Sequence, residues 1–166
     1  MKIEEKEGHL IITNFNELEA YEIACRIEKD GRSFYEELLK KTLNQPLKET
    51  LEFLIKDEEN HLKFFEAQIV RLRTQQDKDQ EENDLLNSLD YGVFSLYQSA
   101  EQIEAIINNP RKVLSLGLAV EKKSIDFYEK CKEKVFSLNT KVELQRIIDE
   151  EKKHRALFEK MLATLQ

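Results

Sequence analysis

Two histidines of this chain occur in the same short motif, and a glutamate precedes each motif at the same distance. Glu58 stands three residues before His61, and Glu151 stands three residues before His154. A further glutamate lies thirty residues before the glutamate of each motif. Two Glu-x-x-His motifs and two single glutamates, each on its own helix, are the ligand set of two iron or manganese ions bound between helices. The spacing therefore predicts a two-metal carboxylate site.

The two patterns match because the chain aligns with itself without a gap at a shift of 93 positions. Glu28 aligns with Glu121, and the pair Phe34-Tyr35 aligns with Phe127-Tyr128. An internal repeat of this length indicates two equivalent supersecondary units. Each unit has the periodicity of two helices, so the sequence predicts two helical hairpins.

The elements that must position these residues form one domain. A long link between two hairpins is typical of the ferritin-like arrangement, whereas an up-down-up-down bundle needs a shorter link. We therefore predict an all-α, ferritin-like four-helix bundle. Its parts are a single domain 1–166, with an N-terminal arm (1–16), a first hairpin (17–74), a long crossover (75–109) and a second hairpin (110–166).

Turn and capping signals bound the helices. Asn14 is one candidate cap for the first helix and Asn16 is the other. The break at 44–46 contains a proline, and we expect the second helix to start at about Leu47. Asn109 followed by proline predicts the start of a helix. We expect a second turn over 137–140, and then the last helix to near the end of the chain.

Helical spacing places the four glutamates and two histidines on apolar stripes, one stripe per helix. Glu28 lies roughly 25 Å of helix before the first turn, and Glu58 with His61 roughly 18–22 Å after it. The ligand sets therefore come to about the same level. The stripe residues are Tyr21, Ala24, Gly31, Tyr35 and Leu38; Leu51, Leu54, Ile55, Leu62 and Phe65; Leu114, Gly117, Leu118, Ile125 and Tyr128; and Leu144, Ile147, Ile148 and Phe158.

Buried carboxylates without partners are costly, and two cations would relieve that cost while using all six side chains. Carboxylates with one imidazole per metal suit two iron ions, with manganese as the alternative, more than a structural zinc ion. By position, Glu58 and Glu151 are the expected bridges. Glu28 and Glu121 are the expected terminal or mobile ligands. The alternative, solvated charges on long helices, leaves the matched repeat unexplained.

Residues near the predicted ligands have two interpretations. Tyr35 and Tyr128 follow the first glutamate of each half by seven positions, and either hydrogen-bond the carboxylates or are core tyrosines. The acidic neighbours of the two bridges, which include Asp57 and Glu150, are expected to face solvent. His9, in the arm, is expected on the surface.

Composition excludes several classes of function. The 166 residues include 36% charged and 40% hydrophobic types, and only four Gly and two Pro, which is typical of a helical protein. A net charge of −7 argues against a nucleic acid or an anionic membrane as partner. No stretch is long enough for a membrane span or a signal peptide, so we expect a cytoplasmic protein. Cys25 and Cys131 are expected to be free, buried thiols.

At these motifs the chain resembles the rubrerythrin-like branch of the ferritin-like di-iron superfamily. The resemblance lies in 27–35 with 57–61, and again in 120–128 with 149–154. It covers about 20–72 and 110–165. It implies a di-iron centre that reacts with hydrogen peroxide or dioxygen, and assembly as a dimer or larger homo-oligomer. The family often has a further glutamate one turn after the ligand at 121, where this chain has Ser124.

The function expected from the resemblance is that of an oxidoreductase. Typical rubrerythrins carry a rubredoxin domain with two Cys-x-x-Cys pairs, which this sequence does not contain. We therefore expect the electrons to come from an external donor protein such as a rubredoxin. One alternative is a ferritin-like protein that binds and oxidises ferrous iron. The other is a non-catalytic bundle that metal stabilises.

Overall fold

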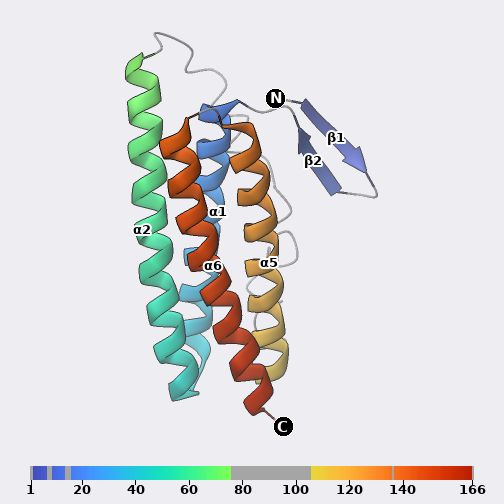
Figure 1. Ribbon diagram of the computed structural model, residues 1–166. Coiled ribbons are helices and arrows are strands. Elements are labelled where there is room, and N and C mark those ends of the chain that lie inside the picture. Colours follow the sequence, from blue (N-terminus) through green and yellow to red (C-terminus); the bar gives the residue numbers. More distant parts are fainter. Residues whose placement is uncertain (1, 7–8, 14–15, 76–105, 136, 166) are drawn as a thin grey trace.

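The computed structural model describes residues 2–6, 9–13, 16–75, 106–135 and 137–165. Four long helices make up most of this part of the chain, and a two-stranded hairpin precedes them (Figure 1). Most of the expected crossover, 76–105, lies outside the described residues. The elements are β1 (Lys2–Lys6), β2 (His9–Thr13), α1 (Glu17–Lys41), α2 (Gln45–Gln75), α5 (Pro110–Lys134) and α6 (Leu138–Thr164).

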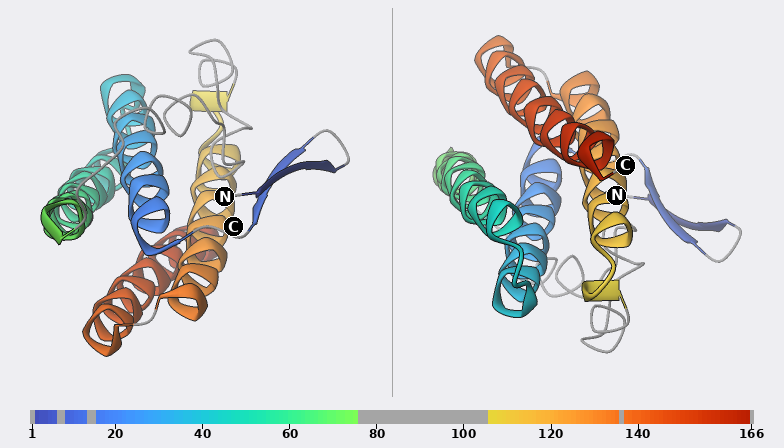
Figure 2. Two further views of the ribbon diagram at one scale, coloured as in Figure 1. Left: turned by 90° about the horizontal axis from the view of Figure 1, so that it is seen from above. Right: turned by 90° about the horizontal axis from the view of Figure 1, so that it is seen from below.

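The four helices form two antiparallel pairs. Helix α1 packs along α2, and α5 packs along α6, while fewer contacts join one pair to the other (Figures 1 and 2). Helix α2 ends and α5 begins at opposite ends of the bundle (Figure 1). The hairpins are therefore joined by a crossover and not by a short turn. The predicted all-α four-helix bundle is confirmed.

Side chains of asparagine and serine start the helices. The Asn16 side chain accepts a hydrogen bond from the Glu19 backbone N–H at 2.9 Å, and the Glu19 carboxylate accepts one from the Asn16 N–H at 2.7 Å. This capping box shows that Asn16 is the cap of α1. Asn44 and Asn109 use their side chains in the same way at the starts of α2 and α5.

Two helices start a few residues earlier than predicted. Helix α6 begins at Leu138, so the turn predicted over 137–140 is shorter than expected. The reason is that the Ser137 side chain accepts from the Thr140 backbone N–H at 3.3 Å and caps the first turn. Helix α2 begins at Gln45, before the predicted Leu47, because a proline at the next position fits a first helical turn.

The apolar stripes predicted from the spacing form the core. Every stripe residue is buried except Ile55 and Leu118, which are half-buried. Cys25 and Cys131 are free and buried, as predicted. Burial raises the pKa of the Cys25 thiol to about 12, so this side chain is an apolar core group and not a thiolate.

The N-terminal arm contains a structure that the sequence did not predict. Strands β1 and β2 pair antiparallel, with Ile3 opposite Ile12. The hairpin projects away from the helices on the side of α5 (Figures 1 and 2). None of the helices within the described residues is both long enough and apolar enough to cross a membrane.

Candidate metal centre

The six predicted ligand side chains come together inside the bundle. None of them is more than 6% exposed. No Lys or Arg of the described residues forms an ion pair with any of them. The centre is thus a buried cluster of four carboxyl groups and two imidazoles. They are Glu28 from α1, Glu58 and His61 from α2, Glu121 from α5, and Glu151 and His154 from α6.

The cluster divides into two overlapping groups that could each hold a metal ion. In each group, one atom per side chain lies within 4.8 Å of the corresponding atoms of the others. The His61 group is Glu28, Glu58, His61 and Glu151; the His154 group is Glu58, Glu121, Glu151 and His154. Only Glu58 and Glu151 belong to both groups, so these two carboxyl groups lie between the two histidines' sets.

Both imidazoles turn their Nδ1 atoms toward the carboxylates. His61 Nδ1 lies 3.0 Å from Glu151 Oε1 and 3.4 Å from Glu28 Oε2. His154 Nδ1 lies 3.4 Å from Glu151 Oε2. Both Nδ1 atoms are buried without a hydrogen-bond partner among the described residues, as are Glu28 Oε2 and Glu151 Oε1. Because buried polar atoms normally have partners, unpaired nitrogen and oxygen atoms that converge in this way fit a shared pair of cations.

The metal-free cluster holds protons. Burial, and then the charge of a neighbouring glutamate, raises the pKa of Glu58 and of Glu121 well above the usual range. Burial alone would lower the pKa of the imidazoles, but the surrounding carboxylates outweigh it. They raise the pKa of His61 to about 12 and that of His154 to about 10. Cations bound here would displace these protons, so metal binding at the cluster is linked to pH.

Each histidine has a second carboxylate on its outer side. His61 Nε2 lies 3.0 Å from Glu150 Oε2, and His154 Nε2 lies 3.1 Å from Asp57 Oδ2. The prediction that Asp57 and Glu150 face solvent was therefore wrong, since each side chain is only 26–29% exposed and contacts the opposite hairpin. Such outer carboxylates fix the ring orientation of a ligating histidine. The repeat marks Asp57 and Glu150 as corresponding residues, because they are 93 positions apart, but it does not show that they face the histidines.

The two tyrosines cross between the hairpins. The Tyr35 hydroxyl donates to Glu121 Oε1, and the Tyr128 hydroxyl donates to Glu28 Oε1. Both side chains are fully buried, so each tyrosine is a core residue and also a partner of a carboxylate. Burial, and then the charges of nearby glutamates, raises the pKa of both phenols. The hydroxyls therefore keep their protons.

Aromatic rings enclose the tyrosine side of the cluster. Phe65 stacks on Tyr128 with ring centroids 5.6 Å apart, and Phe158 lies 6.1 Å from Tyr35. Phe158 also packs against the backbone of Gly117, where an added Cβ would lie 2.5 Å from Cζ of the ring. The glycine is thus required by the close approach of Phe158.

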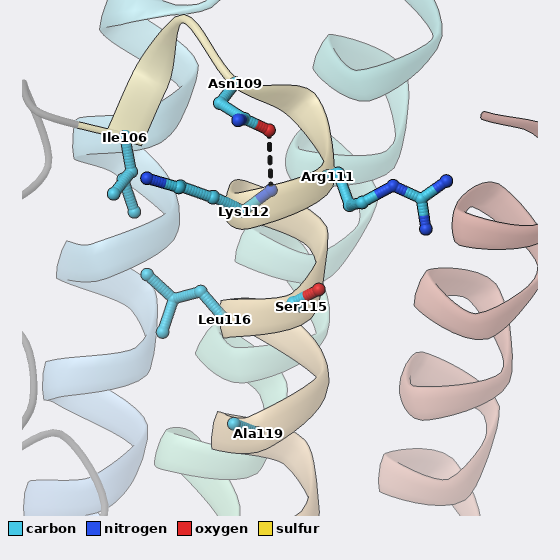
Figure 3. Close-up of a pocket in the computed structure, with 7 residues that line it drawn as sticks. All are labelled: Ile106, Asn109, Arg111, Lys112, Ser115, Leu116 and Ala119. Atoms are coloured by element: carbon cyan, nitrogen blue, oxygen red, sulfur yellow. Dashed lines mark hydrogen bonds between the residues drawn. The ribbon is translucent and has the colours of Figure 1, made fainter. Parts of the chain in front are cut away.

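A surface pocket lies elsewhere on the molecule. It has a volume of about 530 Å³ and is formed by the start of α5 and the residues just before it (Figure 3). Among the described residues that line it there is no carboxylate or imidazole, and none of the six clustered side chains contributes to it. The lining residues are Ile106, Asn109, Arg111, Lys112, Ser115, Leu116 and Ala119.

The sequence was also compared with models of known protein families. A sequence model of the rubrerythrin family matches residues 19–162, which include all six clustered side chains and nearly all of both hairpins. The chain belongs to the rubrerythrin family. This rubrerythrin-family chain has no match among curated proteins.

The fold is similar to that of a solved structure. A Thermotoga maritima protein, described as ferritin-like and diiron-carboxylate, superposes with a TM-score of 0.68 at 23% sequence identity. The match covers 94% of this chain and 100% of the other. At this identity the likeness establishes the ferritin-like fold. The rubrerythrin family and the buried carboxylate–histidine cluster together indicate a di-metal protein.

Proposed function

We propose that the cluster binds two metal ions, iron in the first place and manganese as the alternative. Glu58 and Glu151 would bridge the ions, and Glu28 and Glu121 would each be a terminal ligand. The observation that supports this most strongly is the pair of buried Nδ1 atoms, which lie beside carboxylate oxygens and have no hydrogen-bond partner in the described part of the chain. Each histidine would then serve one ion.

We propose further that the protein reduces hydrogen peroxide or dioxygen. Two ferrous ions, when bound, would supply two electrons, one from each ion, and these electrons together with two protons from solvent reduce one hydrogen peroxide to two waters. The side chains of the cluster hold the ions, and the apolar rings around them, such as Phe65 and Phe158, exclude bulk water. Tyr35 and Tyr128 keep protons on their hydroxyl oxygens at the edge of the cluster.

The electrons must be renewed from outside the cluster. The only cysteines in this sequence, Cys25 and Cys131, are buried on different helices, so they do not form a rubredoxin-type site. We therefore propose an external donor protein such as a rubredoxin. Nothing in this proposal requires a membrane or a nucleic acid as partner.

The test is an anaerobic ferrous titration of metal-free protein, followed by mixing with hydrogen peroxide or with air-saturated buffer. We expect two iron ions per chain and a rise in near-ultraviolet ferric absorbance that is faster with peroxide. Glu58→Gln should abolish binding of the second ion. The matched control is Glu59→Gln, since Glu59 is the adjacent residue, its side chain is 46% exposed, and it pairs with Lys63.

The outcomes separate the candidate functions. Iron taken up beyond two ions per chain, with oxidation by dioxygen as fast as by peroxide, would favour a ferritin-like ferroxidase. Two bound ions that raise stability but react with neither oxidant would leave a metal-stabilised bundle. No saturable binding, or equal binding by Glu58→Gln and by wild type, would refute the site itself.

A further inference from the structure

The surroundings of the two histidines are not equivalent. His154 hydrogen-bonds Asp57, whereas His61 hydrogen-bonds Glu150. Asp57 and Glu150 occupy corresponding positions of the repeat, so one half places an aspartate where the other places a glutamate. The two groups of the cluster therefore differ in the carboxylate behind the imidazole.

A second pair of corresponding residues differs in charge. The ring of Phe53 meets the His154 ring edge-on, with centroids 6.0 Å apart and an interplanar angle of 88°. The position that corresponds to Phe53 in the second half is Arg146, whose Nε lies 3.7 Å from Glu150 Oε1. No Lys or Arg in the described part of the chain forms an ion pair with Asp57.

The electrostatic environment of the two groups follows from these contacts. Behind His154 stands the Asp57 carboxylate, which has no Lys or Arg ion-pair partner among the described residues, and the apolar ring of Phe53 lies beside the imidazole. Behind His61 the carboxylate charge is shared with a guanidinium, which is 66% exposed and also lies 3.6 Å from Glu143. The positive charge of Arg146 also opposes a cation in the His61 group, with solvent screening reducing the effect.

A carboxylate that accepts from the outer nitrogen of a ligating histidine makes the inner nitrogen a better metal ligand. On the basis of the proposed two-metal function, we propose that the two groups bind divalent cations in a fixed order. The His154 group, supported by Asp57, fills first. The His61 group fills second because Arg146 reduces the support that Glu150 provides. Asp57, Glu150 and Arg146 thus act through the histidines as positioning residues.

The order of filling can be observed directly. Metal-free protein with ¹⁵N-labelled histidine is titrated with cobalt(II), and ring signals are followed by NMR. The three histidines of the sequence are assigned by single substitutions. We expect the first equivalent to shift the ring signals of His154 and the second equivalent to shift those of His61. If His61 shifts first, or both shift together, the proposed order is wrong.

Substitutions test which residues set the order, with calorimetry giving the two dissociation constants. Asp57→Asn should weaken the first step by roughly 10–100-fold. Glu150→Gln should weaken the second step and leave the first unchanged. Arg146→Gln should lower the dissociation constant of the second step, so that the two dissociation constants become more similar.

The control for Arg146→Gln is Lys40→Gln. Lys40 is 64% exposed and pairs with Glu37, so this change removes one positive charge from a similarly exposed pair that contacts neither histidine. We expect it to leave both steps unchanged. If Arg146→Gln has no more effect than Lys40→Gln, Arg146 does not cause the difference between the two dissociation constants. Absence of two-ion binding by wild-type protein would refute the proposed function itself, which is a different result from two ions bound in the wrong order.

Discussion

Replacing Gly117 by alanine tests the packing that holds the tyrosine side of the cluster. In an open helix this change stabilises a protein by about 1 kcal/mol, because alanine has the higher helix propensity. Here the new methyl group would lie 2.5 Å from Cζ and 2.6 Å from Cε1 of Phe158. The Phe158 ring is fully buried and lies next to Tyr35, so it has little space in which to move.

The expected result is a net loss of stability. Overpacking of a well-packed core typically costs about 1–3 kcal/mol, which meets or exceeds the gain in propensity. We therefore expect Gly117→Ala to lower the free energy of unfolding by up to about 2 kcal/mol, in metal-free protein unfolded with urea and followed by circular dichroism. For a chain of this size, a loss of 1 kcal/mol lowers Tm by about 2–4 °C.

The repeat supplies the matched control. Ala24 corresponds to Gly117 and lies in the half that contains Phe65. Ala24→Gly should also destabilise, by about 1 kcal/mol from propensity. Phe158→Leu should make room for the methyl group that Gly117→Ala adds. The double variant should therefore lose less stability than the two single variants together, and the difference should lie in the range of about 0.5–3 kcal/mol that is typical of residues in contact. A stability gain of about 1 kcal/mol in Gly117→Ala alone would refute the reasoning.

Three other predictions concern protonation and packing. The unfolded chain loses the protons of Glu58 and Glu121 near pH 4.5, while the folded, metal-free chain keeps them to higher pH. Its free energy of unfolding should therefore fall as pH rises from 5 to 8 in urea titrations with chelator, and a constant or rising value would contradict the burial of these groups. Cys25 and Cys131 should react with a thiol reagent at pH 8 far more slowly in native than in urea-unfolded protein, and equal rates would show that they are not buried. Tyr35→Phe should destabilise the metal-loaded protein by about 1–3 kcal/mol, because it removes the donor to a buried carboxylate, and a neutral result would argue against that hydrogen bond.

The positions of the six clustered side chains could be predicted because they follow from the period of a helix and from the repeat. Glu28 and Glu121, for example, are placed by spacing alone, and the bundle then brings their stripes together. Asp57 and Glu150 could not be placed in this way. Each directly precedes an inward glutamate and so lies at the edge of its helix face. Whether such a residue meets water or a histidine depends on where the other hairpin lies.

The helix starts and the arm show the same limit. Ser137 ends the turn earlier than the apolar pattern indicates, because a cap is a local hydrogen bond that hydropathy does not report. Strand β1 has the sequence Lys-Ile-Glu-Glu-Lys, with a single apolar residue, so no alternation marks it as a strand. The pairing of β1 with β2 becomes visible only in the structure.

The polar contacts around the cluster join residues of one hairpin to residues of the other, in matching pairs. Tyr35 of the first hairpin reaches Glu121 of the second, and Tyr128 of the second reaches Glu28 of the first. In the same manner, the histidine of each hairpin contacts the outer carboxylate of the other hairpin. This reciprocity is the rule of an isologous interface, in which residue i contacts j whenever j contacts i.

Two identical hairpins related by a twofold axis would satisfy the same contacts as a homodimer. Joining the two copies in one chain removes the requirement that they stay identical. The members of a corresponding pair can then be different residues, as Phe53 and Arg146 are. The fusion thus lets a symmetric ligand cage have asymmetric surroundings, which a dimer of identical chains cannot encode.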